Sequence, residues 1–240
     1  FHASNDTDAS PVTTTFVYGL YLHDIYVLNI NATAIEIRRV GVVDLQRVEV
    51  TNFGGNKGIW IHGGNVENIG LVSCKADGSN AANSIGVQIG TNESTGSIVD
   101  FCMVGLEISR CGQYGLYIAN GLYGCVVNLR GEDFADTAGV RVSGQFISLI
   151  GSRVPTPNNA IALDIVLGTG HLVQGVYLEG GGTGDTALMI RADAIGAVIQ
   201  DCRVNNYATK LNNSGTRTRI RDCEGLVTRA SGTVSITSGA

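Results

Sequence analysis

Two aspartates occupy matching places in neighbouring repeats and are the best candidates for paired-carboxylate chemistry. Asp201 and Asp222 lie 21 residues apart, and each follows an isoleucine by two residues and precedes a cysteine. Hydrolysis of a glycosidic bond needs two carboxyl groups about 5 to 9.5 Å apart, and stacked repeats bring equivalent residues to about 5 Å. We therefore predict Asp201 and Asp222 as a catalytic pair. The neighbouring Arg203, Arg219 and Arg221 leave open a purely structural ladder of ion pairs.

A second set of side chains shares the variable position of a recurring pattern: small, apolar, variable, apolar. Aromatic rings pack on the apolar faces of sugars, and planar polar groups form paired hydrogen bonds with hydroxyls or pair with acidic sugars. The predicted glycan-binding residues are Glu36, Trp60, Gln88, Tyr117, Arg141 and Asp164 at that position, with His62 two residues after Trp60. A surface buried between subunits has the same composition, so this alternative stays open. His62, Tyr117 and Arg141 also offer the base and cation of a polysaccharide lyase.

The four-residue pattern recurs along most of the chain. Its copies begin at Ala34, Gly58, Gly86, Gly115, Gly139, Ala162 and Ala187. A second pattern, apolar, two variable, apolar, lies between them, with copies beginning at Leu22, Leu45, Val99, Val173, Ile199 and Ile220. Two short strands that are interleaved and recur every 21 to 30 residues describe one coil of a solenoid.

These repeats predict an all-β chain, a right-handed parallel β-helix of about 8 to 9 coils of roughly 23 to 29 residues each. A leucine-rich repeat would carry a fixed Leu and Asn ladder, and a propeller blade needs about 40 residues or more. We expect a lead-in segment at 1–17, the β-helix at 18–225, and at 226–240 an exit strand toward a C-terminal β domain that is absent. The repeated glycines, such as Gly58 and Gly86, are expected at coil corners.

Composition excludes several classes of function. The 240 residues include 33 glycines and only 15% charged side chains, and the net charge is -5 with scattered basic residues. We therefore expect no nucleic-acid partner. No apolar stretch approaches the ~20 residues of a membrane helix, so we expect no membrane insertion. Cys102, Cys202 and Cys223 are predicted to share an inward position as small hydrophobes, and no Cys or His spacing indicates a metal site or a cofactor.

The segment Val48 to Asn52, the strand Gly58 to Ile61 and the closing segment Asp222 to Val234 together resemble the pectate-lyase-like β-helices of bacteriophage tailspikes. The resemblance implies a homotrimer in the virion tail, outside the cell, in contact with other virion tail proteins. It also implies recognition, and often cleavage, of host cell-surface polysaccharide. No catalytic signature of that group is matched residue by residue, so the resemblance assigns no active site.

Three functions follow as hypotheses. The first is a tailspike or tail-fibre type protein that binds host surface polysaccharide, with or without depolymerase activity. The second is a secreted polysaccharide lyase or hydrolase. The third is a non-catalytic structural protein of a virion or surface fibre, in which the column of side chains around Trp60 is buried between subunits.

Overall fold

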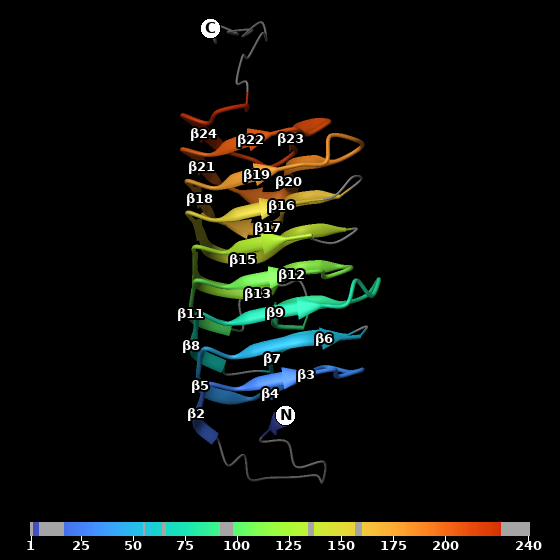
Figure 1. The fold of residues 1–240 in the computed structure, drawn as a ribbon. Helices are drawn as coiled ribbons and strands as arrows, with labels where there is room; N and C mark the ends of the chain where they lie inside the picture. Colours follow the sequence, from blue (N-terminus) through green and yellow to red (C-terminus); the bar gives the residue numbers. More distant parts are fainter. Residues whose placement is uncertain are drawn as a thin grey trace, which may run out of the picture.

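The chain winds into a β-solenoid of about 8 turns in the computed structural model, which describes residues 2–4, 17–54, 56–63, 66–91, 98–133, 137–156 and 160–226 (Figure 1). Each turn contributes a strand to three parallel sheets, so the predicted parallel β-helix is confirmed. Among the described residues there is no helix, and hence none long and apolar enough to span a membrane.

Sheet 1 contains the strands of the first sequence pattern. They are β1 (His2–Ser4), β4 (Ile35–Arg38), β7 (Lys57–His62), β10 (Ile85–Ile89), the first halves of β13 (Tyr114–Val127) and β15 (Ala138–Ile150), β17 (Ile161–Thr169), β20 (Thr186–Ile195) and β23 (Thr209–Asn213).

Sheet 2 continues from sheet 1, because β13 and β15 run through the corner between them and join the two into one 16-stranded sheet. Its other strands are β2 (Val17–His23), β5 (Val40–Gln46), β8 (Val66–Val72), β11 (Ile98–Val104), β18 (Leu172–Gln174), β21 (Val198–Gln200) and β24 (Arg219–Arg221).

Sheet 3 closes each coil and has 8 strands among the described residues. They are β3 (Tyr26–Leu28), β6 (Glu49–Phe53), β9 (Lys75–Gly78), β12 (Glu107–Ser109), β14 (Arg130–Glu132), β16 (Arg153–Pro155), β19 (Tyr177–Glu179) and β22 (Arg203–Asn205). The predicted lead-in segment 1–17 contributes β1, which pairs with β4, and the start of β2. Of the predicted exit segment 226–240, only Leu226 is among the described residues.

The core consists of apolar ladders that run along the solenoid axis. Alternate side chains of each strand point inward, and parallel pairing places equivalent residues of successive coils over one another. One such ladder in sheet 1 contains Ile35, Ile59, Val87, Leu116, Val140, Leu163 and Leu188, which are at most 1% exposed. The apolar half of the repeat therefore forms the core, and the variable half is left for the outer faces.

A tight corner follows every strand of sheet 2. One residue in each corner has a left-handed φ, between 49° and 66°. This conformation favours Gly, Asn and Asp. From the first corner, at Asp24, to the corner at Asp201, the backbone N–H of this residue donates a hydrogen bond to a carbonyl of the next coil. The corner residues are Asp24, Arg47, Ser73, Gly105, Asn128, Gly151, Gly175, Asp201 and Asp222.

The inward position predicted for Cys102 is wrong. Cys102 lies in β11 of sheet 2, opposite Cys125 of β13, and is exposed, whereas Cys202 points into the core at the following corner. Val99 and Cys102 have the spacing of the second pattern, but both belong to β11, whereas in the true copies a corner separates these two positions. The true copy there begins at Met103, which is fully buried.

The corner position predicted for the repeated glycines is also wrong. Gly58 and Gly86 lie inside β7 and β10 and have no positive φ. A Cβ on Gly58 would lie 2.6 Å from the Gly86 carbonyl oxygen and 2.9 Å from the ring of Phe53. The absence of a side chain at Gly58 therefore leaves room for the buried ring of Phe53.

Candidate functional site

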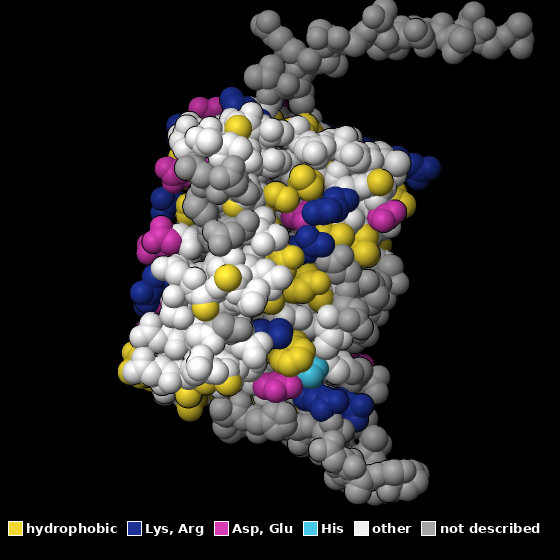
Figure 2. Space-filling view, turned by 90° about the vertical axis from the view of Figure 1, so that its right-hand side faces the viewer, with side chains coloured by type: hydrophobic (Ala, Val, Ile, Leu, Met, Phe, Trp, Pro, Cys, Tyr) yellow, Lys and Arg dark blue, Asp and Glu magenta, His cyan; other side chains and the backbone are white. Residues whose placement is uncertain are grey.

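The predicted glycan-binding side chains form one column on the outer face of sheet 1. Strand pairing places the members on successive coils in the predicted order: Glu36, Trp60, Gln88, Tyr117, Arg141 and Asp164. His62 follows Trp60 in β7 and is opposite Arg38. Figure 2 shows hydrophobic, acidic and basic side chains and a histidine following one another along the axis on this face. The sequence therefore predicted the register of the column correctly.

Trp60 is clamped by its neighbours along the strand. The imidazole of His62 stacks on the indole with 3.7 Å between ring centroids, and the ammonium of Lys57 lies 4.2 Å from the centroid. Lys57 and His62 therefore both lie over the ring. Trp60 Nε1 donates to the carbonyl of Gly90 at 3.0 Å. The indole therefore offers an edge to a ligand rather than an open face.

His62 is buried beside an acidic partner. Its Nε2 lies 2.8 Å from Glu36 Oε1. Burial lowers the pKa of His62 below its ordinary value, although the carboxylate of Glu36 acts in the opposite direction. The imidazole is therefore neutral at pH 7 and donates a hydrogen bond to Glu36, which holds both side chains in place.

Gln88 is less accessible than its outward position suggests. It is 4% exposed, and its Nε2 donates to the carbonyl of Gly90 at 2.8 Å. Its buried Oε1 has no hydrogen-bond partner among the described residues. Gln88 thus separates the cluster around Trp60 from the second half of the column.

The second half of the column is an ionic centre beside two tyrosines. Asp164 is fully buried; its Oδ1 accepts from Arg191 Nε at 2.8 Å, and its Oδ2 accepts from Arg191 Nη2 at 2.9 Å and Arg141 Nη1 at 2.8 Å. The rings of Tyr114 and Tyr117 lie 5.0 Å apart, and the Arg141 guanidinium is 5.6 Å from Tyr114. Two guanidinium groups therefore share one buried carboxylate. Arg191 reaches the surface, with 42% of its side chain exposed.

Asp201 and Asp222 occupy successive corners, as their sequence context predicts. Both side chains are exposed, and both backbones are left-handed, with φ of 55° and 49°. The Asp201 N–H donates to the Arg221 carbonyl at 3.2 Å, and Gln174 Nε2 lies 3.4 Å from Asp201 Oδ2. The structure brings the two aspartates together, and their catalytic role stays a prediction. Among the described residues, no group of three or more His, Cys, Asp or Glu could hold a metal ion.

A groove that the sequence patterns did not indicate lies where the corner after sheet 2 meets sheet 3. It has a volume of about 760 Å³ and extends over four coils. Charged, amide and aromatic side chains line it: Glu107, Asn128, Arg130, Glu132, Arg153 and Tyr177. The signal that could have found it is the row of small corner residues Gly105, Gly151 and Gly175, which only a correct corner alignment makes visible.

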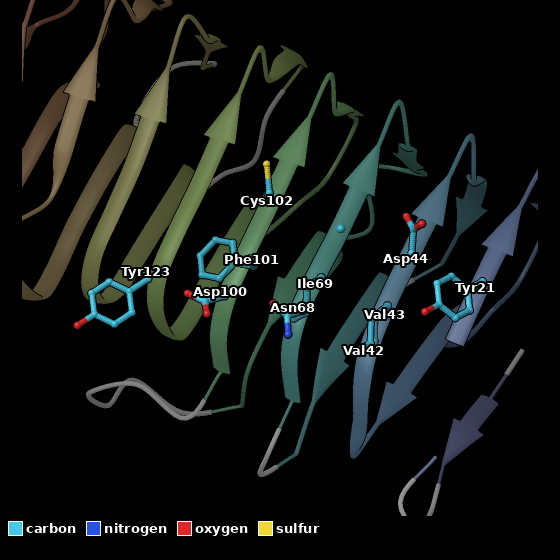
Figure 3. A pocket seen from close by; sticks show the side chains of 11 residues that line it. Tyr21, Val42, Val43, Asp44, Asn68, Ile69, Asp100, Phe101, Cys102 and Tyr123 are labelled. Atoms are coloured by element: carbon cyan, nitrogen blue, oxygen red, sulfur yellow. The ribbon is translucent and has the colours of Figure 1, made fainter. Parts of the chain in front are cut away.

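A shallower depression of about 510 Å³ lies on sheet 2 (Figure 3). It crosses five successive coils, at β2, β5, β8, β11 and β13, and its lining includes Tyr21, Asp44, Asp100, Cys102 and Tyr123. Beyond it, the exposed rings of Tyr123 and Phe146 stack at 5.3 Å. Much of the surrounding outer face is apolar, with Val72, Val104, Val127 and Ile150 opposite one another on successive strands.

Comparisons with known proteins yield similarity of structure alone. No protein-family model matches the chain, and no curated protein matches it. The chain is similar to tailspike protein 2 (TSP2, ORF211) of Escherichia coli O157:H7 bacteriophage CAB120, with a TM-score of 0.47 and 12% identity. The match covers 83% of this chain and 33% of the tailspike, so this chain spans about a third of that protein's length.

A second similar structure is a candidate glycosyl hydrolase from Parabacteroides merdae ATCC 43184. The TM-score is 0.31 and the identity 12%, over 69% of this chain and 82% of that one. The assignment of this chain as a parallel β-helix protein rests on its own strand pairing, and neither similarity carries an argument about activity.

Proposed function

We propose that this chain is the β-helix part of an extracellular, tailspike-type protein of a phage tail that binds bacterial surface polysaccharide along sheet 1. The observation that carries the proposal is the centre formed by Arg141, Asp164 and Arg191 beside Tyr114 and Tyr117. A buried carboxylate orients two guanidinium groups next to aromatic rings, and one guanidinium is partly exposed. This combination suits an acidic sugar, which needs a cation for its carboxylate and a ring for its apolar face.

The test measures binding of the protein to an array of purified bacterial capsules and lipopolysaccharides. Arg191→Gln removes the exposed cation and is expected to weaken binding of the best acidic polysaccharide roughly tenfold, the size of one charge-assisted hydrogen bond. The matched control is Arg219→Gln, an exposed arginine of sheet 2. Equal weakening by both substitutions, or no binding to any polysaccharide, would refute the proposal.

Cleavage is a separate part of the proposal and falls to Asp201 and Asp222. These residues lie at corners between sheets 2 and 3, so they would act on a segment of the polysaccharide other than the one held on sheet 1. Incubation with a bound polysaccharide should release reducing ends if these carboxylates act as acid and base. Asp201→Asn and Asp222→Asn should each abolish that product while leaving binding unchanged. Product formation by either variant would assign the two residues to the structural ladder instead.

The proposed homotrimer uses sheet 2. The apolar ladder Val72, Val104, Val127 and Ile150, together with the exposed pair of Tyr123 and Phe146, is the kind of surface that subunits bury. Light scattering after size exclusion should give three times the chain mass for the native protein and the monomer mass for Val127→Glu. A native monomer would favour a secreted enzyme, and a trimer that binds no glycan would favour a structural fibre protein.

A further inference from the structure

The groove on sheet 3 owes its depth to missing side chains at the corners of the middle coils. The corners carry Asp24, Arg47 and Ser73 in the first coils and Asp201 and Asp222 in the last. In between, Gly105, Gly151 and Gly175 leave the corner bare, and only Asn128 projects a side chain there. A left-handed corner accepts Asn or Asp as well as Gly, so the backbone does not demand this run of glycines. The consequence is a trough about 760 Å³ in volume beside β12, β14, β16 and β19.

The charges along the groove change their pattern at the same place. After Tyr26, the outward column of sheet 3 continues with Glu49, Lys75, Glu107 and Arg130, and the charges of these four residues alternate in sign. Lys75 Nζ lies 3.3 Å from Glu49 and 3.8 Å from Glu107. The alternation ends between Arg130 and Arg153, which are paired across β14 and β16. Like charges directly opposite on neighbouring strands are destabilising.

The two arginines differ in how they are neutralised. Arg153 Nη2 donates to Glu179 Oε2 at 2.8 Å. Arg130 is exposed and forms no ion pair with any residue that the structure describes. An anion placed between the two guanidinium groups would remove their repulsion and form charge-assisted hydrogen bonds with both.

The other groups of the groove identify the kind of anion. Glu107 and Glu132 also line it. Their carboxylates accept hydrogen bonds from hydroxyl groups, which a saccharide carries and an inorganic anion lacks. Tyr177 follows Arg153 on the next coil and is half-buried, with the Arg203 guanidinium 5.5 Å from its ring. The ring of Tyr177 could therefore pack on the apolar face of a sugar. It lies one coil, about 4.8 Å, from Arg153.

From these observations we infer that the sheet 3 groove is a second saccharide site, with Arg130 and Arg153 clamping the carboxylate of an acidic sugar and Tyr177 contacting the next residue of the chain. The inference rests on the proposed polysaccharide function but uses another face of the solenoid. Spatially separate faces would let one solenoid contact two strands of a polysaccharide, or two segments of one strand.

The experiment measures binding of hexagalacturonate to the full chain by titration calorimetry, with its methyl ester as the uncharged probe and sulfated dextran as a second anion. Arg130→Gln is expected to weaken hexagalacturonate binding roughly tenfold and to leave the weak binding of the ester unchanged. Gly175→Asn fills the groove without a steric collision, because a Cβ there meets nothing closer than 3.9 Å, and Asn128 adopts the same left-handed backbone at the equivalent corner. It should weaken both probes.

Two controls separate this inference from the proposed function. Arg219→Gln removes the same charge from an exposed position of sheet 2 and should leave hexagalacturonate binding unchanged. Arg191→Gln removes the exposed cation of the sheet 1 centre and measures any hexagalacturonate binding that occurs there. Weakening by Arg191→Gln but not by Arg130→Gln would overturn this inference and support sheet 1 alone. If Arg130→Gln weakens hexagalacturonate binding but the protein binds no bacterial polysaccharide in the array, the saccharide site in the groove is supported and the proposed function is overturned. Tighter binding of sulfated dextran than of hexagalacturonate would reassign the clamp to sulfate groups.

Discussion

Asp164→Asn tests whether the ionic centre of sheet 1 is held by its buried carboxylate. The side chain of Asp164 is 0% exposed, and both of its oxygens accept hydrogen bonds from arginines. The amide keeps the shape of the side chain and one acceptor oxygen. It removes the negative charge and turns an N–H group toward a guanidinium. Arg141 and Arg191 then lose the carboxylate that both of them bind.

The size of the effect follows from the exposure of the three partners. Removal of one member of a buried ion pair costs about 3 to 5 kcal/mol. Arg141 is 15% and Arg191 42% exposed, so water can solvate part of the released charge. We therefore expect the free energy of unfolding to fall by about 2 to 3 kcal/mol. For a chain of this length, that corresponds to a thermal midpoint about 5 to 10 °C lower.

The assay is urea unfolding followed by circular dichroism. Asp201→Asn is the matched control, since Asp201 is exposed at a corner and its loss should cost no more than about 0.5 kcal/mol. The double variant Asp164→Asn with Arg191→Gln should recover part of the loss, because it removes one of the uncompensated charges. If Asp164→Asn unfolds within about 0.5 kcal/mol of the native protein, the carboxylate does not hold the centre and the proposed binding surface loses its basis.

Three further predictions concern other parts of the solenoid. Burial lowers the pKa of His171, so the unfolded chain takes up a proton first as the pH falls below about 6.5. Thermal midpoints should drop from there toward lower pH, and His171→Gln should reduce that slope. Cys102 should react with Ellman's reagent in the folded Val127→Glu monomer, whereas Cys111, whose pKa burial raises to about 12, should react only after unfolding; equal rates would contradict the assigned faces. Gly168→Ala should prevent soluble expression, because its φ is 107° and a Cβ would collide with the backbone of the neighbouring coil. At Gly196 a Cβ meets no atom nearby, so Gly196→Ala should lower stability in urea unfolding by only about 1 kcal/mol, the strain of the left-handed backbone.

The sequence contained enough to place the column of sheet 1 coil by coil. In each copy of the first pattern, the outward residue is the second one after the small residue, so the copies align without gaps. Apolar neighbours such as Ile59 and Ile61 face the core and leave the residue between them on the outer face. The burial of Gln88 and Asp164 could not be read in the same way. At Asp164 it results from Arg191, whose long side chain reaches along the axis from the next coil. Position in a strand predicts the direction of a side chain, but not what lies over it.

The sheet 3 groove was hidden for a different physical reason. A left-handed corner is satisfied by the backbone of Gly, Asn, Asp, Ser or Arg, as Ser73, Arg47 and Asp24 show, so apolar periodicity carries no information about it. Where the fold tolerates many residue types, the residue present reflects another requirement. Three bare corners beside an interrupted alternation of charge are therefore better explained by a ligand than by the solenoid itself. The same argument applies to Arg130 and Arg153, whose juxtaposition costs stability and contributes nothing to the core.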